Sequence, residues 1–134
     1  MPQPMDEKDA KIIEILRMNA RKKNTEIARA IGLTEGAVRA RISALKKSGK
    51  IKRFTIEAES VGVEGIVLVA TDAAKTKEVV SKLKDMSEAV YETSGDYDAA
   101  ILIRSANVDD LNSNVDRIRE LPGVVRTSTL IRMA

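Results

Sequence analysis

The sequence predicts an α+β fold in two parts, with three helices in the N-terminal part and a βαββαβ arrangement in the C-terminal part. Before residue 50, apolar residues recur at helical spacing in three short segments. Beyond residue 65 the sequence repeats itself, because a shift of 35 positions lays IVLV at 66–69 over ILIR at 101–104. We therefore expect a helical domain over residues 1–50, a linker strand or hinge over residues 51–64, and a second domain over residues 65–134.

The first helix is expected over residues 6–20, which read DEKDAKIIEILRMNA. Acidic residues at its start suit the positive end of the helix dipole. Its apolar side chains fall on one face at helical spacing, and they are Ile12, Ile13, Leu16 and Ala20. The segment therefore predicts a helix that packs against its neighbours.

Two further helices are expected after the polar break RKKN. Asn24 or Thr25 is placed to cap a short helix that ends near Ile31, and Gly32 is placed to stop this helix in the left-handed conformation. Thr34 is placed to cap the third helix. The inward stripe of the third helix should consist of Val38, Ile42 and Leu45.

The joint between the second and third helices has the pattern of a helix-turn-helix: a small residue at the helix contact, a glycine in the turn and apolar residues on both sides. The six positions that carry it are Ile27, Ala28, Ile31, Gly32, Leu33 and Val38. One departure is Arg41, which stands where many such motifs have an apolar residue. We assign the core contact to Ile42 and expect Arg41 to contact a phosphate.

The charge of the N-terminal part favours double-stranded DNA as a partner. Residues 1–60 carry 14 Lys/Arg against 8 Asp/Glu, whereas residues 61–134 carry 9 against 12. Between Arg17 and Arg53, 12 basic residues face only Glu26 and Glu35. Such a field attracts phosphates and releases their counterions. A solvated, ion-rich surface of a thermostable protein is the alternative interpretation.

If the third helix enters a major groove, its first turns face the base edges. Arg39 is the best candidate for a bidentate contact to guanine, while Lys46 and Lys47 would position the helix by contacting phosphates. The expected DNA-binding residues are Asn24, Thr25, Thr34, Glu35, Gly36, Ala37, Arg39, Ala40, Arg41, Ser43, Lys46 and Lys47. A plain solvent-facing helix is the alternative.

The linker and the C-terminal repeat follow. Residues 51–56 alternate as a strand does, and the two glycines of SVGVEG predict the domain boundary. Each repeat then reads strand, helix, strand, with second strands expected within MSEAVYETS at 86–94 and LPGVVRTST at 121–129. Two such units predict the ferredoxin-like fold, an antiparallel four-stranded sheet with both helices on one face.

The other face of this sheet needs a cover, which predicts a homodimer because a small domain usually buries such a face by twofold self-association. A dimer would set two recognition helices against paired half-sites. RNA binding through the sheet is disfavoured, since it needs exposed aromatic residues and the second domain offers only Tyr91 and Tyr97.

The composition removes most catalytic chemistry. The chain has no cysteine and no histidine, so thiol nucleophiles, thiolate or imidazole metal ligands and the commonest general base are absent. We expect no enzyme activity, no metal and no cofactor. No apolar run is long enough to span a membrane and no signal peptide opens the sequence, so we expect a cytoplasmic protein with no membrane partner.

The stretch SGDYDAA at 94–100 places Asp96 and Asp98 beside a glycine. Paired carboxylates of this kind suit an acid/base pair, a metal site or a ligand pocket. A polar hairpin turn is the simplest interpretation, because glycine and aspartate are ordinary turn residues. A carboxylate-pair hydrolase would need a defined separation and a cleft, and two loop residues establish neither.

Taken together, TEIARAIGLTEGAVRARISALKKSGKIKRF, SGDYDAAILIR and the closing LPGVVRTSTLI resemble the leucine-responsive/asparagine-regulator (Lrp/AsnC) family of transcription factors, of archaeal type. The resemblance covers nearly the whole chain from Met5. It implies dimers joined through the sheet, tetramers or octamers of these dimers, and a free amino acid bound between dimers. The effector-binding residues that it implies are Ser94, Gly95, Asp96, Tyr97, Asp98, Ala99, Thr127, Ser128 and Thr129.

In such a site one of the aspartates would accept hydrogen bonds from the α-ammonium of the effector, while Gly95 would let the main chain approach its carboxylate. The polar face of the second repeat's helix would suit a basic or amide side chain, so we expect lysine, arginine or glutamine. Its residues are Asp109, Asn112, Ser113 and Asp116, and a solvated helix face is the alternative interpretation of them. The alternative function is an architectural DNA-binding protein with little sequence specificity and no effector, because Gly36, Ala37 and Ala40 are small.

Overall fold

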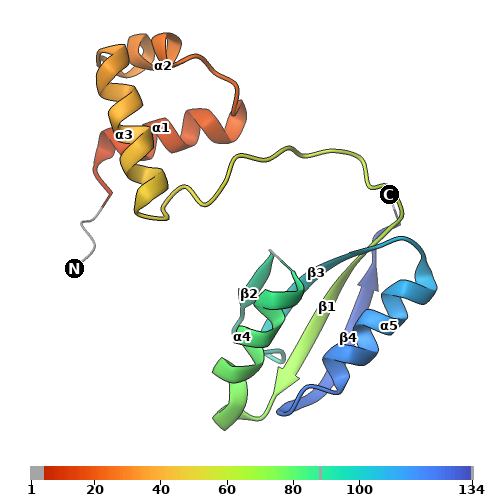
Figure 1. The fold of residues 1–134 in the computed structure, drawn as a ribbon. Coiled ribbons are helices and arrows are strands. Elements are labelled where there is room, and N and C mark those ends of the chain that lie inside the picture. Colours follow the sequence, from red (N-terminus) through yellow and green to blue (C-terminus); the bar gives the residue numbers. More distant parts are fainter. Residues whose placement is uncertain (1–4, 88, 134) are drawn as a thin grey trace. The chain divides into compact units, whose positions relative to one another are not determined.

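The computed structural model describes residues 5–87 and 89–133, so the parts of the expected domains that fall on residues 1–4, 88 and 134 lie outside the described residues. The chain divides into two compact units, Met1–Ala58 and Glu59–Ala134 (Figure 1). None of the helices in the described ranges combines the length and the apolar character needed to cross a membrane.

The first unit contains α1 (Glu7–Met18), α2 (Asn24–Ile31) and α3 (Glu35–Lys47). Asp6 caps α1 by accepting a hydrogen bond from the backbone N–H of Asp9, and Thr34 caps α3 in the same way from Ala37. Gly32 ends α2 with φ 74°, a left-handed conformation that favours glycine. The buried core of the unit is formed by Ile12, Leu16, Ile27, Ala28, Ile31, Val38 and Leu45.

Two details of the helix ends differ from the sequence prediction. The residue before α2 is Lys23, and neither Asn24 nor Thr25 caps the helix, because both already lie inside its first turn. Ala20 lies beyond the end of α1 and is exposed, so it takes no part in the predicted stripe. The polar break therefore begins two residues earlier than expected.

The predicted linker strand is wrong. Residues 52–60 form no helix or strand, and both Phe54 and Ile56 are exposed. An alternating sequence supplies the side chains of a strand, but a strand also needs a hydrogen-bonding neighbour, and in the described part of the chain no strand pairs with this segment.

The second unit has the expected βαββαβ order, with a four-stranded antiparallel sheet in the order β2-β3-β1-β4. Its elements are β1 (Val63–Thr71), a short 3-10 helix η1 (Ala73–Lys75), α4 (Thr76–Met86), β2 (Val90–Glu92), β3 (Ala99–Ser105), α5 (Val108–Arg119) and β4 (Val124–Ile131). The ferredoxin-like prediction is confirmed. The second strand is shorter than MSEAVYETS, because Met86 still belongs to α4.

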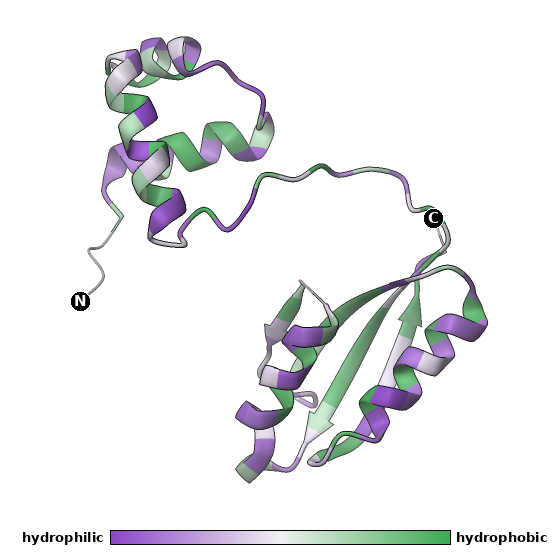
Figure 2. Cartoon of the chain, viewed as in Figure 1, coloured by the Kyte–Doolittle hydropathy of each residue, from purple (hydrophilic) through white to green (hydrophobic). Residues whose placement is uncertain are grey.

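Both helices lie on the same face of the sheet (Figure 1). Figure 2 shows strands that are largely hydrophobic beside helices that alternate hydrophobic and hydrophilic residues. The core between the two layers is formed by Val67, Val69, Val79, Val80, Leu83, Ala99, Ile101, Ile103, Leu111, Val115 and Ile118.

The opposite, open face of the sheet carries a row of aliphatic side chains. Ile66 pairs with Leu102 on one side and with Leu130 on the other, and Ile66 and Leu130 are exposed. At one end of this face the buried carboxylate of Glu64 accepts hydrogen bonds from Arg104 and Arg132. These two guanidinium groups hold the pKa of Glu64 below its ordinary value.

Candidate DNA-binding surface and effector loop

The outward face of α3 consists of small and basic residues. Gly36, Arg39, Ala40, Ser43 and Lys47 lie on it at a spacing of i, i+3, i+4, i+7 and i+11, which places them on one side of the helix. The inward side contains Val38 and Leu45, which are buried against the other two helices. The sequence pattern therefore located this face correctly as a solvent-facing surface.

Arg39 lies on this face and is paired within the helix. Its Nη2 donates to Oε2 of Glu35 at 2.6 Å, and both groups are accessible to solvent. Such an exposed pair one turn apart is weak, so the guanidinium can exchange this partner for another acceptor. Further along, the ammonium of Lys46 lies 5.9 Å from the ring centroid of Phe54.

The other expected DNA-binding residues lie at the starts of helices. Asn24 and Thr25 open α2, where Asn24 is half-buried and Thr25 is exposed. Thr34 precedes the first turn of α3, which contains Glu35 and Ala37. The helix-turn-helix joint thus leaves the start of each of these two helices accessible, while its apolar residues form the core.

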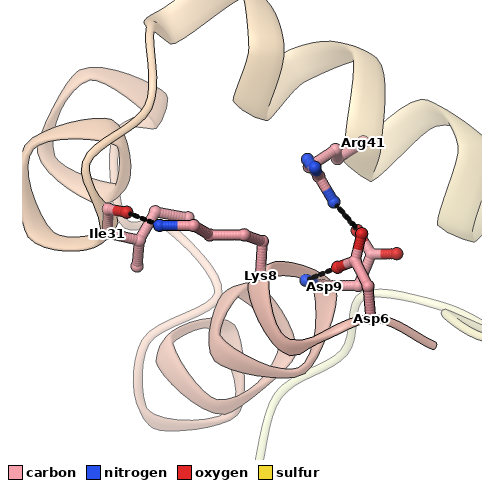
Figure 3. Close-up of polar contacts among 5 residues, drawn as sticks. All are labelled: Asp6, Lys8, Asp9, Ile31 and Arg41. Carbon is pink, nitrogen blue, oxygen red and sulfur yellow. Dashed lines mark hydrogen bonds and ion pairs between the residues drawn. The ribbon is translucent and has the colours of Figure 1, made fainter.

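Arg41 is the expected site residue whose environment differs most from the prediction (Figure 3). Its Nη1 donates to Oδ2 of Asp6 at 2.5 Å and to Oδ1 of Asp9 at 3.2 Å. The hydrogen bond between Arg41 and Asp6 raises the pKa of the guanidinium and lowers the pKa of the Asp6 carboxyl. Arg41 therefore has partners at the start of α1, whereas the sequence suggested a phosphate contact.

The loop between β2 and β3 is closed by its own backbone. The N–H of Thr93 donates to the carbonyl of Asp98 at 2.9 Å, and the hydroxyl of Thr93 donates to the carbonyl of Tyr97 at 2.7 Å. Gly95 has φ 111°, and a Cβ added there would meet no atom within 4 Å. The positive φ of the turn therefore explains a glycine at this position, whereas steric crowding by the described residues around it does not.

The two aspartates of the loop have different environments. Asp98 is half-buried, and its Oδ2 accepts from the backbone N–H of Thr71 at 2.7 Å and from the hydroxyl of Thr71 at 3.2 Å. This carboxylate fastens the loop to the end of β1. Asp96 is exposed, which makes its carboxylate the better candidate to meet a ligand ammonium.

Arg126 is a neighbour of this loop that the sequence analysis missed. Its Nη2 donates to the carbonyl of Asp96 at 3.2 Å, and its guanidinium carbon lies 5.2 Å from the ring centroid of Tyr97. Arg126 is the one basic residue of the segment VVRTSTLI that forms β4. Its charge was visible in the sequence, but its position next to the loop depends on how β4 and β3 flank β1.

The three hydroxyls expected to complete the effector site do not converge within this chain. Successive strand residues point to opposite faces, and the register pairs Thr129 with the buried Val67 but Ser128 with Leu68 on the open face. On the helix side, Thr127 accepts from Nε of Arg119 at 3.0 Å. Thr129 Oγ1 is buried with no hydrogen-bond partner among the described residues.

The remaining residues of the expected effector loop differ in how far they are exposed to solvent. Ser94 is exposed, Tyr97 is half-buried, and Ala99 is fully buried in the core beneath the helices. Nowhere in the described ranges do three or more carboxylates form a group that could hold a metal ion. The accessible part of the loop is therefore Ser94 to Tyr97, with Arg126 beside it.

Comparison with known proteins assigns both units. Residues 5–46 match the family model described as an AsnC-type helix-turn-helix domain, and residues 64–134 match the Lrp/AsnC ligand binding domain. The chain is 44% identical over 131 residues to the HTH-type transcriptional regulator LysM of Sulfurisphaera tokodaii, covering 95% of this chain and 94% of that protein.

Two other comparisons agree. The HTH-type transcriptional regulator FL11 of Pyrococcus horikoshii is 42% identical over 134 residues, covering 96% of this chain and 89% of that protein. A feast or famine regulatory protein of M. tuberculosis, solved in complex with L-methionine, has a TM-score of 0.75 at 22% identity, covering 98% of this chain and 93% of that one. At this identity the structural likeness shows the fold alone.

Proposed function

The chain belongs to the Lrp/AsnC family of transcriptional regulators, and from this membership we propose that it binds defined sites on double-stranded DNA and regulates genes of amino-acid metabolism in response to a free amino acid. It is a regulator with a ligand-binding domain and not an enzyme. The observation that carries the DNA-binding half of the proposal is the accessible, basic outward face of α3 behind a helix-turn-helix core.

In the proposed complex this face enters the major groove. Arg39 leaves Glu35 and reads a guanine, a contact typically worth about 1 to 3 kcal/mol of discrimination. Lys46 and Lys47 bind phosphates, and the first turn of α2, with Asn24 and Thr25, meets the backbone beside them. The remaining proposed contacts come from Thr34, Glu35, Gly36, Ala37, Ala40 and Ser43.

The proposed effector site is the loop of Ser94 to Asp98. The exposed carboxylate of Asp96 accepts from the α-ammonium of the amino acid, and Asp98 holds the loop in place through Thr71. Because Thr127, Ser128 and Thr129 face different sides of β4, a site that uses all three hydroxyls has to take them from more than one chain. This requirement supports an effector bound between dimers.

The proposed identity of the effector comes from one protein of the same fold and from the polar residues of α5. One M. tuberculosis protein of this fold is complexed with L-methionine, which supports an amino acid as the class of ligand. The polar residues Asp109, Asn112, Ser113 and Asp116 on α5 carry acid, amide and hydroxyl groups that suit a basic or amide side chain. We therefore propose lysine, arginine or glutamine.

One observation favours an architectural protein as the second candidate function. Gly36, Ala37 and Ala40 present little side chain for reading base edges, so the outward face could bind DNA with little preference for sequence. Competition between a selected duplex and a scrambled one distinguishes the two, because a specific regulator prefers its own site by about 10³-fold or more.

The test of the effector proposal is a thermal-unfolding scan against each of the twenty amino acids. A ligand at 100 times its Kd stabilises the folded protein by about 2.7 kcal/mol, so one or two amino acids should raise Tm and the others should not. The variant Asp96→Asn should lose this shift, whereas Glu78→Gln, at an exposed acidic residue on α4, should retain it. No shift with any amino acid would contradict the proposal.

A second measurement tests the link between the two sites. If the effector changes the affinity for DNA, linkage requires DNA to change the affinity for the effector by the same factor. Isothermal titration of the effector with and without the selected duplex should give two affinities whose ratio equals the ratio measured in DNA binding. Equal effector affinities, together with unchanged DNA binding, would remove the regulatory part of the proposal.

A further inference from the structure

Arg41 lies on the inward side of α3. Val38, Arg41, Ile42 and Leu45 have the spacing i, i+3, i+4 and i+7, which places all four on one stripe of the helix. Val38 and Leu45 are buried, and Ile42 packs against the same core. The outward face that contains Arg39 and Lys47 therefore lies on the other side of the helix from Arg41.

The partners of Arg41 come from the start of α1. The side chains of Arg41 and Asp9 retain 33% and 20% of their accessible surface, so this ion pair is more enclosed than the Arg39–Glu35 pair. Asp6 adds a second carboxylate, which also caps α1. One guanidinium thus faces two carboxylates, an arrangement that neutralises Arg41 without any phosphate.

The same turn of α1 also contacts the end of α2. The ammonium of Lys8 donates to the carbonyl of Ile31 (Figure 3), one of the last carbonyls of α2 that lack a partner within the helix. Gly32, which forms the turn of the motif, follows directly. The start of α1 therefore holds α2 through Lys8 and α3 through Asp6 and Asp9.

From these contacts we infer that Arg41 is a positioning residue of the DNA-binding unit, which sets the orientation of α3 against α1 through Asp6 and Asp9 and does not bind a DNA phosphate. Moving Arg41 to a phosphate would break both ion pairs and separate the guanidinium from two carboxylates. The inference rests on the proposed function, since it concerns how the outward face of α3 is presented to DNA.

The salt dependence of DNA binding separates a positioning role from a phosphate contact. The salt slope is the slope of the logarithm of the affinity plotted against the logarithm of the salt concentration. It is about −0.9 for each phosphate that the protein neutralises. The test uses a short duplex selected from a random pool with the unmodified protein, and a scrambled duplex of the same composition. Arg41→Gln should leave this slope unchanged, whereas the matched control Lys47→Gln should reduce its magnitude by about 0.9 for each chain bound to the duplex, since every chain loses one neutralised phosphate.

The preference for the selected duplex over the scrambled one is the second readout. Arg41→Gln should reduce this preference about fivefold or more, because a tilted α3 misplaces base contacts. The double variant Asp6→Asn/Asp9→Asn should reduce it similarly, and asparagine at position 6 retains the helix cap. Removing two negative charges would by itself tighten binding to both duplexes and leave the preference unchanged. A reduced preference therefore identifies a positioning role for these residues.

All affinities are measured well below the melting temperature of each variant, with circular dichroism confirming the helix content. If Arg41→Gln does not fold, the double variant decides. A salt slope of smaller magnitude for Arg41→Gln, or tighter binding of both duplexes with unchanged preference for the double variant, would overturn the inference. Failure of the unmodified protein to bind either duplex would instead contradict the proposed function.

Discussion

Thr34 shows how one side chain fixes the start of the recognition helix. Its hydroxyl accepts from the N–H of Ala37 at 3.1 Å, and removing a threonine cap typically costs about 1 kcal/mol. Thr34→Ala should therefore lower the free energy of unfolding of the first unit by about this amount in urea titrations. Thr25→Ala is the matched control, because Thr25 caps no helix. An equal decrease in both variants would show that the cap is not the cause.

Glu64 makes stability depend on pH. Hydrogen bonds from Arg104 and Arg132 lower its pKa in the folded state below the ordinary value of 4.5. A carboxyl with a lowered pKa stabilises the fold fully above the unfolded-state pKa and loses this effect as pH falls through the folded-state pKa. Glu64→Gln should therefore be less stable than the unmodified protein at neutral pH, with a difference that shrinks below pH 4.5.

The measurement is a series of thermal melts from neutral to acid pH. Glu92→Gln serves as the control, since Glu92 is exposed on β2, and it should follow the unmodified protein at every pH. A constant difference between Glu64→Gln and the unmodified protein across the series would argue against the ion pairs as the source of the stabilisation.

Among the helices and strands, α5 is held to the sheet by a narrow apolar stripe. Leu111 is fully buried, whereas Val108, one turn earlier on the same helix, is 47% exposed. Leu111→Ala should lower the free energy of unfolding of the second unit by about 2 to 5 kcal/mol, because it removes buried methyl groups and leaves a cavity. Val108→Ala should change it far less, and comparable decreases would show that α5 packs differently.

For the protein as an assembly, the open face of the sheet is the surface through which we expect two chains to join. Ile66 is 45% exposed in the middle of an aliphatic row with Leu102 and Leu130. If this face joins two chains, Ile66→Lys should shift the sedimentation coefficient toward that of the monomer, because dimerisation of the variant would bury an unpaired charge. The control is Val108→Lys, because Val108 on α5 is about as exposed as Ile66, and this variant should sediment as the unmodified protein does. An Ile66→Lys protein that still dimerises would place the interface elsewhere.

The amino-acid sequence was sufficient to predict the βαββαβ order, the three N-terminal helices, the Gly32 stop and the Thr34 cap. These features depend on spacing along one segment, where periodicity and local hydrogen bonds act between residues a few positions apart. For the same reason it located the outward face of α3. It failed for residues 51–56, since alternation cannot reveal whether a partner strand exists.

The packing of the folded chain decided which residues far apart in the sequence come into contact. The partners of Arg41 lie 32 and 35 positions away, and Arg126 reaches Asp96 from 30 positions away. Likewise, the register of β4 on β1 separated the three hydroxyls of Thr127, Ser128 and Thr129 onto two faces. Such contacts follow from how helices and strands pack on one another, and the spacing of residues within a single segment contains no information about that packing.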